Sequence, residues 1–367
     1  MQFHLDEDQL ALKDSVARVL RERCRDGLSR RAVDGDGAVE DELSPALFDL
    51  GIGGLLVPEE HGGLGLGLLE AALVSDCMGY EAVPWPFLGH SIAVLALSTC
   101  GDAAQKRAWL PRLATGDARA TFAFAEEGEC WSPESWTLPI TGGRVSGRKR
   151  FVLGAETADL VVVGTAGGGL ALAEMSGVTR TEERGLDGTR RISVLAFDEV
   201  AVEPLTAGDA DAVTDALLVL LAADAHGCMR RCIDMTVAYA GERRQFGRPI
   251  GSFQGLKHQL ANATADMVPT EAMYWYAAVA GALGPAAGAL SAAQTKAHVT
   301  DRAVEVARLA VEMHGGIGYT WEYDLQIWLK RAMFDYAYGG TPQAHRARAM
   351  DLADMTEADS SALADLL

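Results

Sequence analysis

The stretch GGRVSGRKRFVLGAETADLVVVGTAGGGLALAEM, residues 142–175, decides the fold class, because it alternates short β-rich runs with glycine-rich turns. Runs of the same kind lie on either side of it, FAFAEE at 122–127 and ISVLAFDEVAVEP at 192–204. Branched and aromatic residues bounded by Gly, Ser and Pro are typical of an antiparallel sheet. The run Gly167-Gly168-Gly169 is predicted to be a hairpin tip, since it lacks the strand-to-helix context of a dinucleotide-binding loop.

The segments on both sides of this region have helical periodicity. Residues 5–26 place leucine and valine on one stripe with charges opposite. Ser44-Pro45 is interpreted as an N-cap and a first-turn proline, opening a short helix that ends at Leu50. Further helices are predicted at 212–242, 252–283, 286–314 and 322–337.

The predicted order along the chain, first helices, then strands, then helices, indicates an α+β protein in three parts. We expect an N-terminal α-helical domain at residues 1–118, a middle antiparallel, β-barrel-like domain at 119–206, and a C-terminal helical bundle at 207–367.

Composition excludes several classes of partner. With 32 Lys and Arg against 51 Asp and Glu, the formal net charge is −19, so we expect no nucleic-acid partner, and any anionic ligand must meet a local basic cluster.

The most apolar stretch, 216–223, is too short to span a bilayer, and we expect no signal peptide and no membrane segment. The six cysteines form no CxxC pair, which favours reduced thiols in the cytoplasm. His226, His258 and His298 fall on separate predicted helices, so no metal site is expected.

Three segments carry residues suited to a binding site. ERRQFGRPIGSFQGLKHQLA, residues 242–261, holds a positive cluster of Arg243, Arg244 and Arg248, for which a solvated helix end is the alternative interpretation. VEMHGGIGYTWEYDLQIWLKRA, residues 311–332, ends a helix at a Gly-Gly pair beside His314, which we expect to be a packed residue. DYAYGGTPQAHR, residues 335–346, is another glycine turn before a helix whose N-terminus could receive a phosphate or a flavin edge.

In this order and spacing, preceded by VPEEHGGLGLGLLEAAL at 57–73, these segments resemble the acyl-CoA dehydrogenase family over essentially the whole chain. The resemblance implies an N-terminal helical domain, a middle β-domain and a C-terminal four-helix bundle. It also implies FAD bound between domains and across a subunit interface. The reaction it implies is α,β-dehydrogenation of an acyl thioester: a carboxylate removes the α-proton, and the β-hydride passes to the flavin.

The resemblance assigns cofactor contacts one by one. Arg243 and Phe246, with Gln245 between them, correspond to the family's RxxFG motif, which holds a neighbouring subunit's FAD. Gly315 and Gly316 match the Gly-Gly loop that meets the same FAD. The remaining assignments are Glu312 in place of the family's glutamine, Thr341, Gln343 and Phe151 toward the cofactor, and Tyr338 toward the substrate.

The sequence departs from the family where the chemistry is performed. The usual base is the glutamate of a Tyr-Glu-Gly-Thr turn, and here the turn reads Tyr338-Gly339-Gly340-Thr341. The alternative base position on the first long bundle helix is Leu217, with Leu218 after it. In the β-domain, Phe151-Val152-Leu153 stands where the family has the Trp-Ile-Thr on which the isoalloxazine stacks. No residue of this chain is therefore predicted to be catalytic.

These departures favour a subunit without its own base, which completes the FAD site of a homologous acyl-CoA dehydrogenase chain in a heterotetramer. The substrate would be an acyl-CoA or an acyl-carrier-protein thioester. The segment TWEYDLQIWLKRA, residues 320–332, resembles enzymes for bulky steroid-derived thioesters more than the straight-chain enzymes. Two alternatives stay open. One is a self-sufficient homo-oligomeric flavoprotein with oxygenase or oxidase chemistry, and the other is a flavin-free, thioester-binding scaffold.

Overall fold

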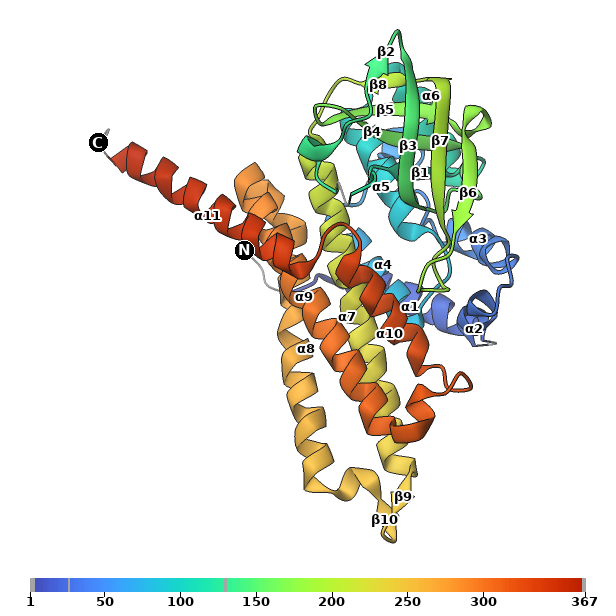
Figure 1. The fold of residues 1–367 in the computed structure, drawn as a ribbon, viewed down its shortest axis with the longest axis vertical. Coiled ribbons are helices and arrows are strands. Elements are labelled where there is room, and N and C mark those ends of the chain that lie inside the picture. The colour runs from blue at the N-terminus through green and yellow to red at the C-terminus, as the bar shows by residue number, and fades with distance from the viewer. Residues whose placement is uncertain (1–3, 26, 129–130, 365–367) are drawn as a thin grey trace. The chain divides into compact units, whose positions relative to one another are not determined.

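The computed structural model describes residues 4–25, 27–128 and 131–364, and the chain divides into two compact units (Figure 1). One unit comprises Met1–Val33, Ala72–Val83 and Leu218–Leu367, and the other comprises Asp34–Ala71 and Pro84–Leu217. The first consists mainly of the bundle helices, and the second contains the larger sheets. The domain limits at residues 118 and 206 stay a prediction.

Six helices precede the sheets among the described residues. They are α1 (Glu7–Cys24), α2 (Leu28–Val33), α3 (Val39–Asp49), α4 (Leu68–Glu81), α5 (Phe87–Cys100) and α6 (Ala103–Thr115). The start of α1 is fixed by a capping box, in which the Asp6 carboxylate accepts from the Gln9 backbone and the Gln9 side chain accepts from the Asp6 backbone.

The predicted start of α3 at Ser44-Pro45 was wrong. The helix begins at Val39, and Pro45 lies inside it. Val39, Leu43 and Leu47 recur every four residues and are each 1% exposed, so burial of this face outweighs the proline. The Ser44 hydroxyl donates to the backbone oxygen of Glu40 instead of capping a helix.

The strands of the second unit form two four-stranded sheets within the described residues. One has the order β1-β4-β5-β8 and the other β2-β3-β7-β6. Their bounds are β1 (Ala120–Ala123), β2 (Ile140–Thr141), β3 (Arg144–Leu153), β4 (Leu160–Thr165), β5 (Gly169–Glu174), β6 (Thr179–Glu183), β7 (Ile192–Ala201) and β8 (Glu203–Leu205). The predicted hairpin tip is confirmed, because β4 and β5 pair antiparallel on either side of residues 166–168.

One pair in these otherwise antiparallel sheets runs parallel. β1 runs parallel to β4, with Ala120 opposite Leu160 and Ala123 opposite Val163. All six residues of β4 are buried, as is usual for a strand covered on both faces. Strand direction depends on contacts far apart in sequence, and composition does not report it.

The bundle contains α7 (Ala210–Glu242), α8 (Gln254–Ala280), α9 (Pro285–His314), α10 (Leu325–Ala337) and α11 (Pro342–Ala364). The predicted start of α10 at residue 322 was wrong by three residues. Gly315–Tyr319 forms a 3-10 helix, and both the backbone N–H and the hydroxyl of Thr320 donate back to Ile317. Thr320 therefore closes the preceding turn and does not cap α10.

Close helix packing fixes the interior of the bundle. A Cβ at Gly79 of α4 would overlap the backbone oxygen of Asp224, and a Cβ at Gly227 of α7 would overlap that of Asp76. Helix α7 is long and apolar enough to cross a membrane by those two criteria alone, but 94% of its most apolar 18-residue window is buried within the protein. This is the pattern of a core helix.

Candidate functional site

A short hairpin follows α7 at the lower end of the bundle in Figure 1. Strands β9 (Arg244–Gln245) and β10 (Arg248–Pro249) pair antiparallel, leaving Phe246-Gly247 as a two-residue turn. Both turn residues have positive φ, 51° and 78°. Such turns normally use Asn or Gly, so a phenylalanine here is strained. Its side chain is 91% exposed. The hairpin thus holds an aromatic ring out into solvent.

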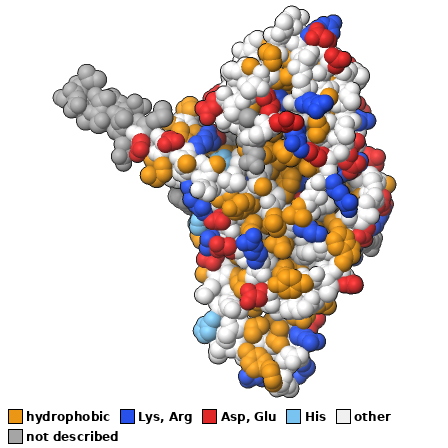
Figure 2. Space-filling model, viewed as in Figure 1, with side chains coloured by type: hydrophobic (Ala, Val, Ile, Leu, Met, Phe, Trp, Pro, Cys, Tyr) orange, Lys and Arg blue, Asp and Glu red, His pale blue; other side chains and the backbone are white. Residues whose placement is uncertain are grey.

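Basic side chains surround this ring. Arg243, Arg244 and Arg248 are all exposed, and the Arg248 guanidinium lies 4.0 Å from the centre of the Phe253 ring. Figure 2 shows hydrophobic and basic side chains side by side at this end of the molecule. In a chain of net charge −19, this is the local positive cluster that an anionic ligand requires.

The predicted Gly-Gly loop lies at the same end of the bundle. His314 ends α9, is buried, and stacks on Tyr239 of α7 with ring centroids 4.4 Å apart. The Tyr239 hydroxyl donates to the His314 backbone oxygen at 3.3 Å, which joins the ends of α7 and α9. The expectation that His314 is a packed residue is confirmed, and burial lowers its pKa. Gly315 and Gly316 are exposed, and Cβ atoms there would meet nothing within 4 Å.

The turn at the family's base position faces hydrocarbon. Gly339 and Gly340 have φ of +74° and +105°. A Cβ at Gly339 would lie 3.2 Å from Leu218 Cδ2 and 3.5 Å from Leu221 Cδ1, with nothing else among the described residues within 4 Å. Leu218 and Leu221 are 4% and 0% exposed. On α7, Leu218 and not the predicted base position Leu217 faces this turn.

Two buried side chains anchor this turn. Lys296 Nζ donates to the backbone oxygens of Gly340 at 2.9 Å and Tyr336 at 3.2 Å, and His345 Nε2 lies 2.9 Å from the Gly339 oxygen. Burial lowers the pKa of Lys296 to about 7 and that of His345 to about 4. The neutral imidazole must donate through Nε2, because the partner is a carbonyl. The only sequence signal for Lys296 was a single cation on the buried stripe of α9.

Three further predicted contacts lie around the same turn. Tyr338 is 5% exposed and stacks on Phe334, with ring centroids 4.8 Å apart. The Thr341 hydroxyl accepts from the Ala344 backbone at the start of α11, and Gln343 is exposed.

In the sheet unit, the half-buried ring of Phe151 already stacks on another side chain. The φ of Phe151 is +55°, and its ring stacks on Trp131 with centroids 5.5 Å apart and planes 26° apart. The Arg150 guanidinium lies 4.9 Å from the same ring centre. Val152 and Leu153, which replace the family's Ile and Thr, are buried. No local sequence pattern indicates the contact between Phe151 and Trp131.

Glu126, which follows β1, is held in hydrogen bonds and an ion pair that join the two sheets. Glu126 accepts from Lys149 Nζ at 2.5 Å, from the Thr137 backbone at 3.0 Å and from the Leu138 backbone at 3.2 Å. Burial alone would raise the pKa of Glu126, but the hydrogen bonds from Lys149 and Thr137 outweigh it and hold the pKa below its usual value.

Two clusters in the bundle have side chains that could bind a metal ion, Asp76-His226-Glu271 and Asp224-Cys228-Asp335. In the first, Lys13 Nζ already lies 3.0 Å from Asp76 and 2.8 Å from Glu271, where a cation would have to sit. In the second, Arg331 bonds both carboxylate oxygens of Asp224, at 2.8 and 2.7 Å. We assign both clusters to internal ion pairs.

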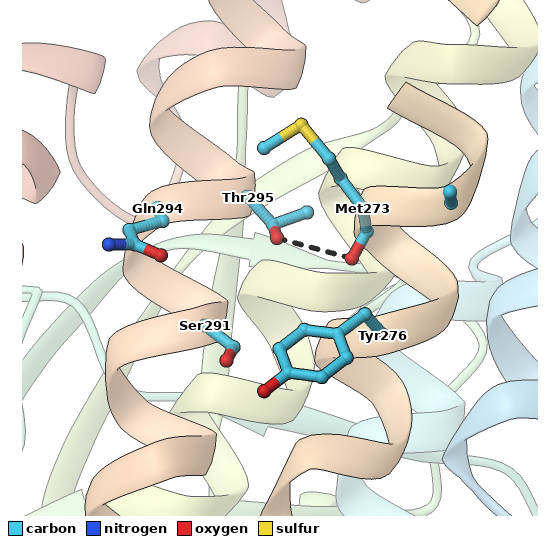
Figure 3. A pocket seen from close by; sticks show the side chains of 6 residues that line it. Met273, Tyr276, Ser291, Gln294 and Thr295 are labelled. Atoms are coloured by element: carbon cyan, nitrogen blue, oxygen red, sulfur yellow. Dashed lines mark hydrogen bonds between the residues drawn. The ribbon is translucent and has the colours of Figure 1, made fainter. Parts of the chain in front are cut away.

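A hollow of about 280 Å³ lies between α8 and α9 (Figure 3). It is lined by Ala272, Met273, Tyr276, Ser291, Gln294 and Thr295, and the Thr295 hydroxyl donates to the Met273 backbone oxygen at 3.4 Å. None of the predicted site residues lines it, and its lining contains no carboxylate or imidazole.

Comparison with known proteins agrees with this arrangement. The models "Acyl-CoA dehydrogenase, N-terminal domain" and "Acyl-CoA dehydrogenase, C-terminal domain" match residues 6–117 and 219–351. The acyl-CoA dehydrogenase IpdE2 of Mycolicibacterium smegmatis is 30% identical over 345 residues, covering 94% of this chain and 98% of that protein. The chain belongs to the acyl-CoA dehydrogenase family. This confirms the predicted fold class, and it makes the chain part of an oxidoreductase system that acts on acyl-CoA.

Solved acyl-CoA dehydrogenases share the fold. The Tcur3481-Tcur3483 steroid acyl-CoA dehydrogenase is 26% identical with a TM-score of 0.87, covering 96% of this chain and 99% of that one. The ChsE4-ChsE5 complex from Mycobacterium tuberculosis is 25% identical with a TM-score of 0.84, covering 95% and 97%.

FAD is the cofactor of this family, and the described residues fit it unevenly. In the bundle, Arg243 and Phe246 are exposed, and the bare backbone of Gly315-Gly316 permits close approach of a flat or charged group. In the sheet unit, the aromatic position is already covered by Trp131. The bundle residues are therefore accessible to a FAD molecule, whereas the Phe151 ring is already stacked by a side chain of its own unit.

Proposed function

We propose that this chain is the subunit without a catalytic base in a heteromeric acyl-CoA dehydrogenase, where it completes the FAD site of a homologous partner chain. One observation carries the proposal: at Gly339, which the resemblance aligns with the family's glutamate, a Cβ would meet the isobutyl groups of Leu218 and Leu221, and Gly339 has no other such neighbour among the described residues apart from those adjacent in the chain. Removal of an α-proton beside a thioester needs a base, and losing one typically costs about 10²- to 10⁴-fold in rate. Hydrocarbon at this position supplies none.

The surviving residues indicate what the chain still does. FAD, when bound, would accept the hydride from the substrate's β-carbon. Arg243 would bind the anionic pyrophosphate, because a guanidinium donates two parallel N–H bonds to phosphate oxygens. Phe246 would cover the flat part of the cofactor and exclude water. Both act on a cofactor held mainly by another chain.

The substrate class and partner follow from the relatives. One neighbour is a steroid acyl-CoA dehydrogenase and another is a complex of two named chains. We therefore propose a bulky, steroid-derived acyl-CoA as substrate and a homologous acyl-CoA dehydrogenase subunit as partner. All five described cysteines, from Cys24 to Cys232, are free, which supports a reducing cytoplasmic location.

The test compares the chain alone with the chain co-expressed with a homologous subunit that carries the Tyr-Glu-Gly-Thr glutamate. We expect the two to co-purify, and the flavin to be bleached by an acyl-CoA only in the complex. Reduction of flavin by acyl-CoA at ordinary speed in the chain alone would refute the proposal. Oxygen consumption with reduced flavin would instead favour an oxidase, and a colourless protein that binds acyl-CoA would favour a scaffold.

A further inference from the structure

We infer that Trp131 closes the isoalloxazine position of this chain's own sheet unit, so that the subunit contributes to FAD binding only through its bundle. The inference rests on the proposed function and goes further by assigning which half of the cofactor site is lost and to which side chain.

The backbone first aims Phe151 out of the regular strand. In the β3–β7 ladder, Lys149 pairs with Leu195 but Val152 pairs with Ser193, so β3 contains one extra residue between them. Phe151 lies in this bulge with φ of +55°. Bulges redirect a side chain and recur beside binding sites, so the backbone is shaped to present a ring at this point.

The presented ring is then covered from within the same unit. Trp131 stacks on Phe151 at 5.5 Å, and Phe124 contacts Trp131 with centroids 5.8 Å apart. Phe122 extends the series by stacking on Phe124 at 4.9 Å. An indole and an isoalloxazine are both flat, and both stack on a phenyl ring in the same offset geometry. A flavin could therefore stack on Phe151 only by displacing Trp131.

The neighbouring side chains offer a flavin no new hydrogen bonds that would offset the displacement of Trp131. The Arg150 guanidinium lies 4.9 Å from the Phe151 ring centre, so the Phe151 ring also makes a cation–π contact within the chain. Val152 and Leu153 offer methyl groups where the family's threonine offers a hydroxyl to the flavin's polar edge. A ring that entered would lose hydrogen bonds to water without replacing them.

The first experiment measures FAD binding to the isolated full chain by flavin fluorescence. We expect Trp131→Gly to bind FAD at least 10-fold more tightly than the wild type. Trp109→Gly is the matched control, because Trp109 is also half-buried, and its indole packs against the guanidinium of Arg112, 4.8 Å away, and not against Phe151. Equal affinities in the Trp131→Gly and Trp109→Gly variants would overturn the inference, and so would stoichiometric FAD binding by the wild type.

The second experiment uses the complex with the homologous subunit and counts FAD released on denaturation. We expect one FAD per pair of chains in the wild type. Combining Trp131→Gly with Phe151→Trp, Val152→Ile and Leu153→Thr should raise the ratio toward two. A wild-type ratio of two, or an unchanged ratio in a folded combined variant, would overturn the inference. The isolated-chain titration needs no partner, so failure of the heteromer proposal would show separately, as failure to co-purify.

Discussion

Replacement of Phe246 by alanine tests whether the bundle binds the cofactor through the tip of its hairpin. The phenyl ring is 91% exposed, and the ring of Phe253 lies edge-on to it, with centroids 6.1 Å apart. Alanine keeps the Cβ, so the strain of the positive φ at this position stays the same. The substitution therefore removes the ring and leaves the turn intact.

The magnitude follows from the area that the ring would bury. Burying a phenylalanine side chain contributes about 1.5–3 kcal/mol. Loss of the ring should therefore raise the dissociation constant of FAD from the complex by roughly 10- to 150-fold. The free energy of unfolding of the isolated chain should change by no more than about 0.5 kcal/mol, because so little of the ring is buried there.

The assay is a flavin fluorescence titration of the complex, with denaturant unfolding of the isolated chain beside it. Leu186→Ala is the control, since Leu186 is 56% exposed in the sheet unit and far along the chain from the hairpin. A change in FAD affinity of less than twofold in the Phe246→Ala complex would refute the assignment. An equal loss of affinity in Leu186→Ala would show that exposed apolar groups act non-specifically.

Three further predictions concern the interior. Lys149→Met should lower the free energy of unfolding of the isolated chain, measured in urea, by about 3–5 kcal/mol, because Glu126 stays buried without its cation. Adding Glu126→Gln should recover part of that loss. An unchanged unfolding midpoint in Lys149→Met would contradict the reasoning. Burial lowers the pKa of His90 to about 4, so its contribution to stability is present above about pH 6.5 and is lost as the pH falls toward 4, by up to about 3 kcal/mol. Unfolding measured across that range should therefore depend less on pH in His90→Gln, and equal slopes would count against burial as the cause. Gly339→Glu should cost about 1–2 kcal/mol, because φ is +74° and Leu218 crowds the new Cβ, and it should leave flavin reduction by acyl-CoA in the isolated chain at background. A 100-fold gain in that rate would show that the chain's own ring position is open.

Local chemistry explains which helix limits were predictable. The helix expected at 286–314 is Pro285–His314 in the structure, because a proline at its first position and a glycine with φ of 64° after its end are local signals. The start of α3 was missed because what decides it is the burial of Val39 and Leu43, which depends on other parts of the fold. The direction of β1 against β4 was missed for the same reason.

The candidate site divides in a similar way. The glycine in place of the base was visible in the sequence, because it lies in a turn whose flanking residues fit the family. That Leu218 faces it depends on the rotational phase of a 33-residue helix, which periodicity alone does not fix. The Trp131 contact depends on a bulge in β3 and on a loop far from it in sequence, so no local pattern could report it.

Backbone strain links the two aromatic residues that the resemblance assigns to FAD. Among the described residues, four other than glycine have positive φ, and the two aromatic ones are Phe151 and Phe246, both expected to contact FAD. Strained backbone persists only where the surrounding structure enforces it, and it is common at binding sites. Both residues thus have positive φ, but their rings differ in accessibility: Phe246 is 91% exposed, whereas Phe151 is stacked by Trp131. The isoalloxazine position at Phe151 is therefore blocked by side chains, whereas the backbone that would present it is intact. For this reason, a few substitutions at 131 and 151–153 should suffice to restore flavin binding there.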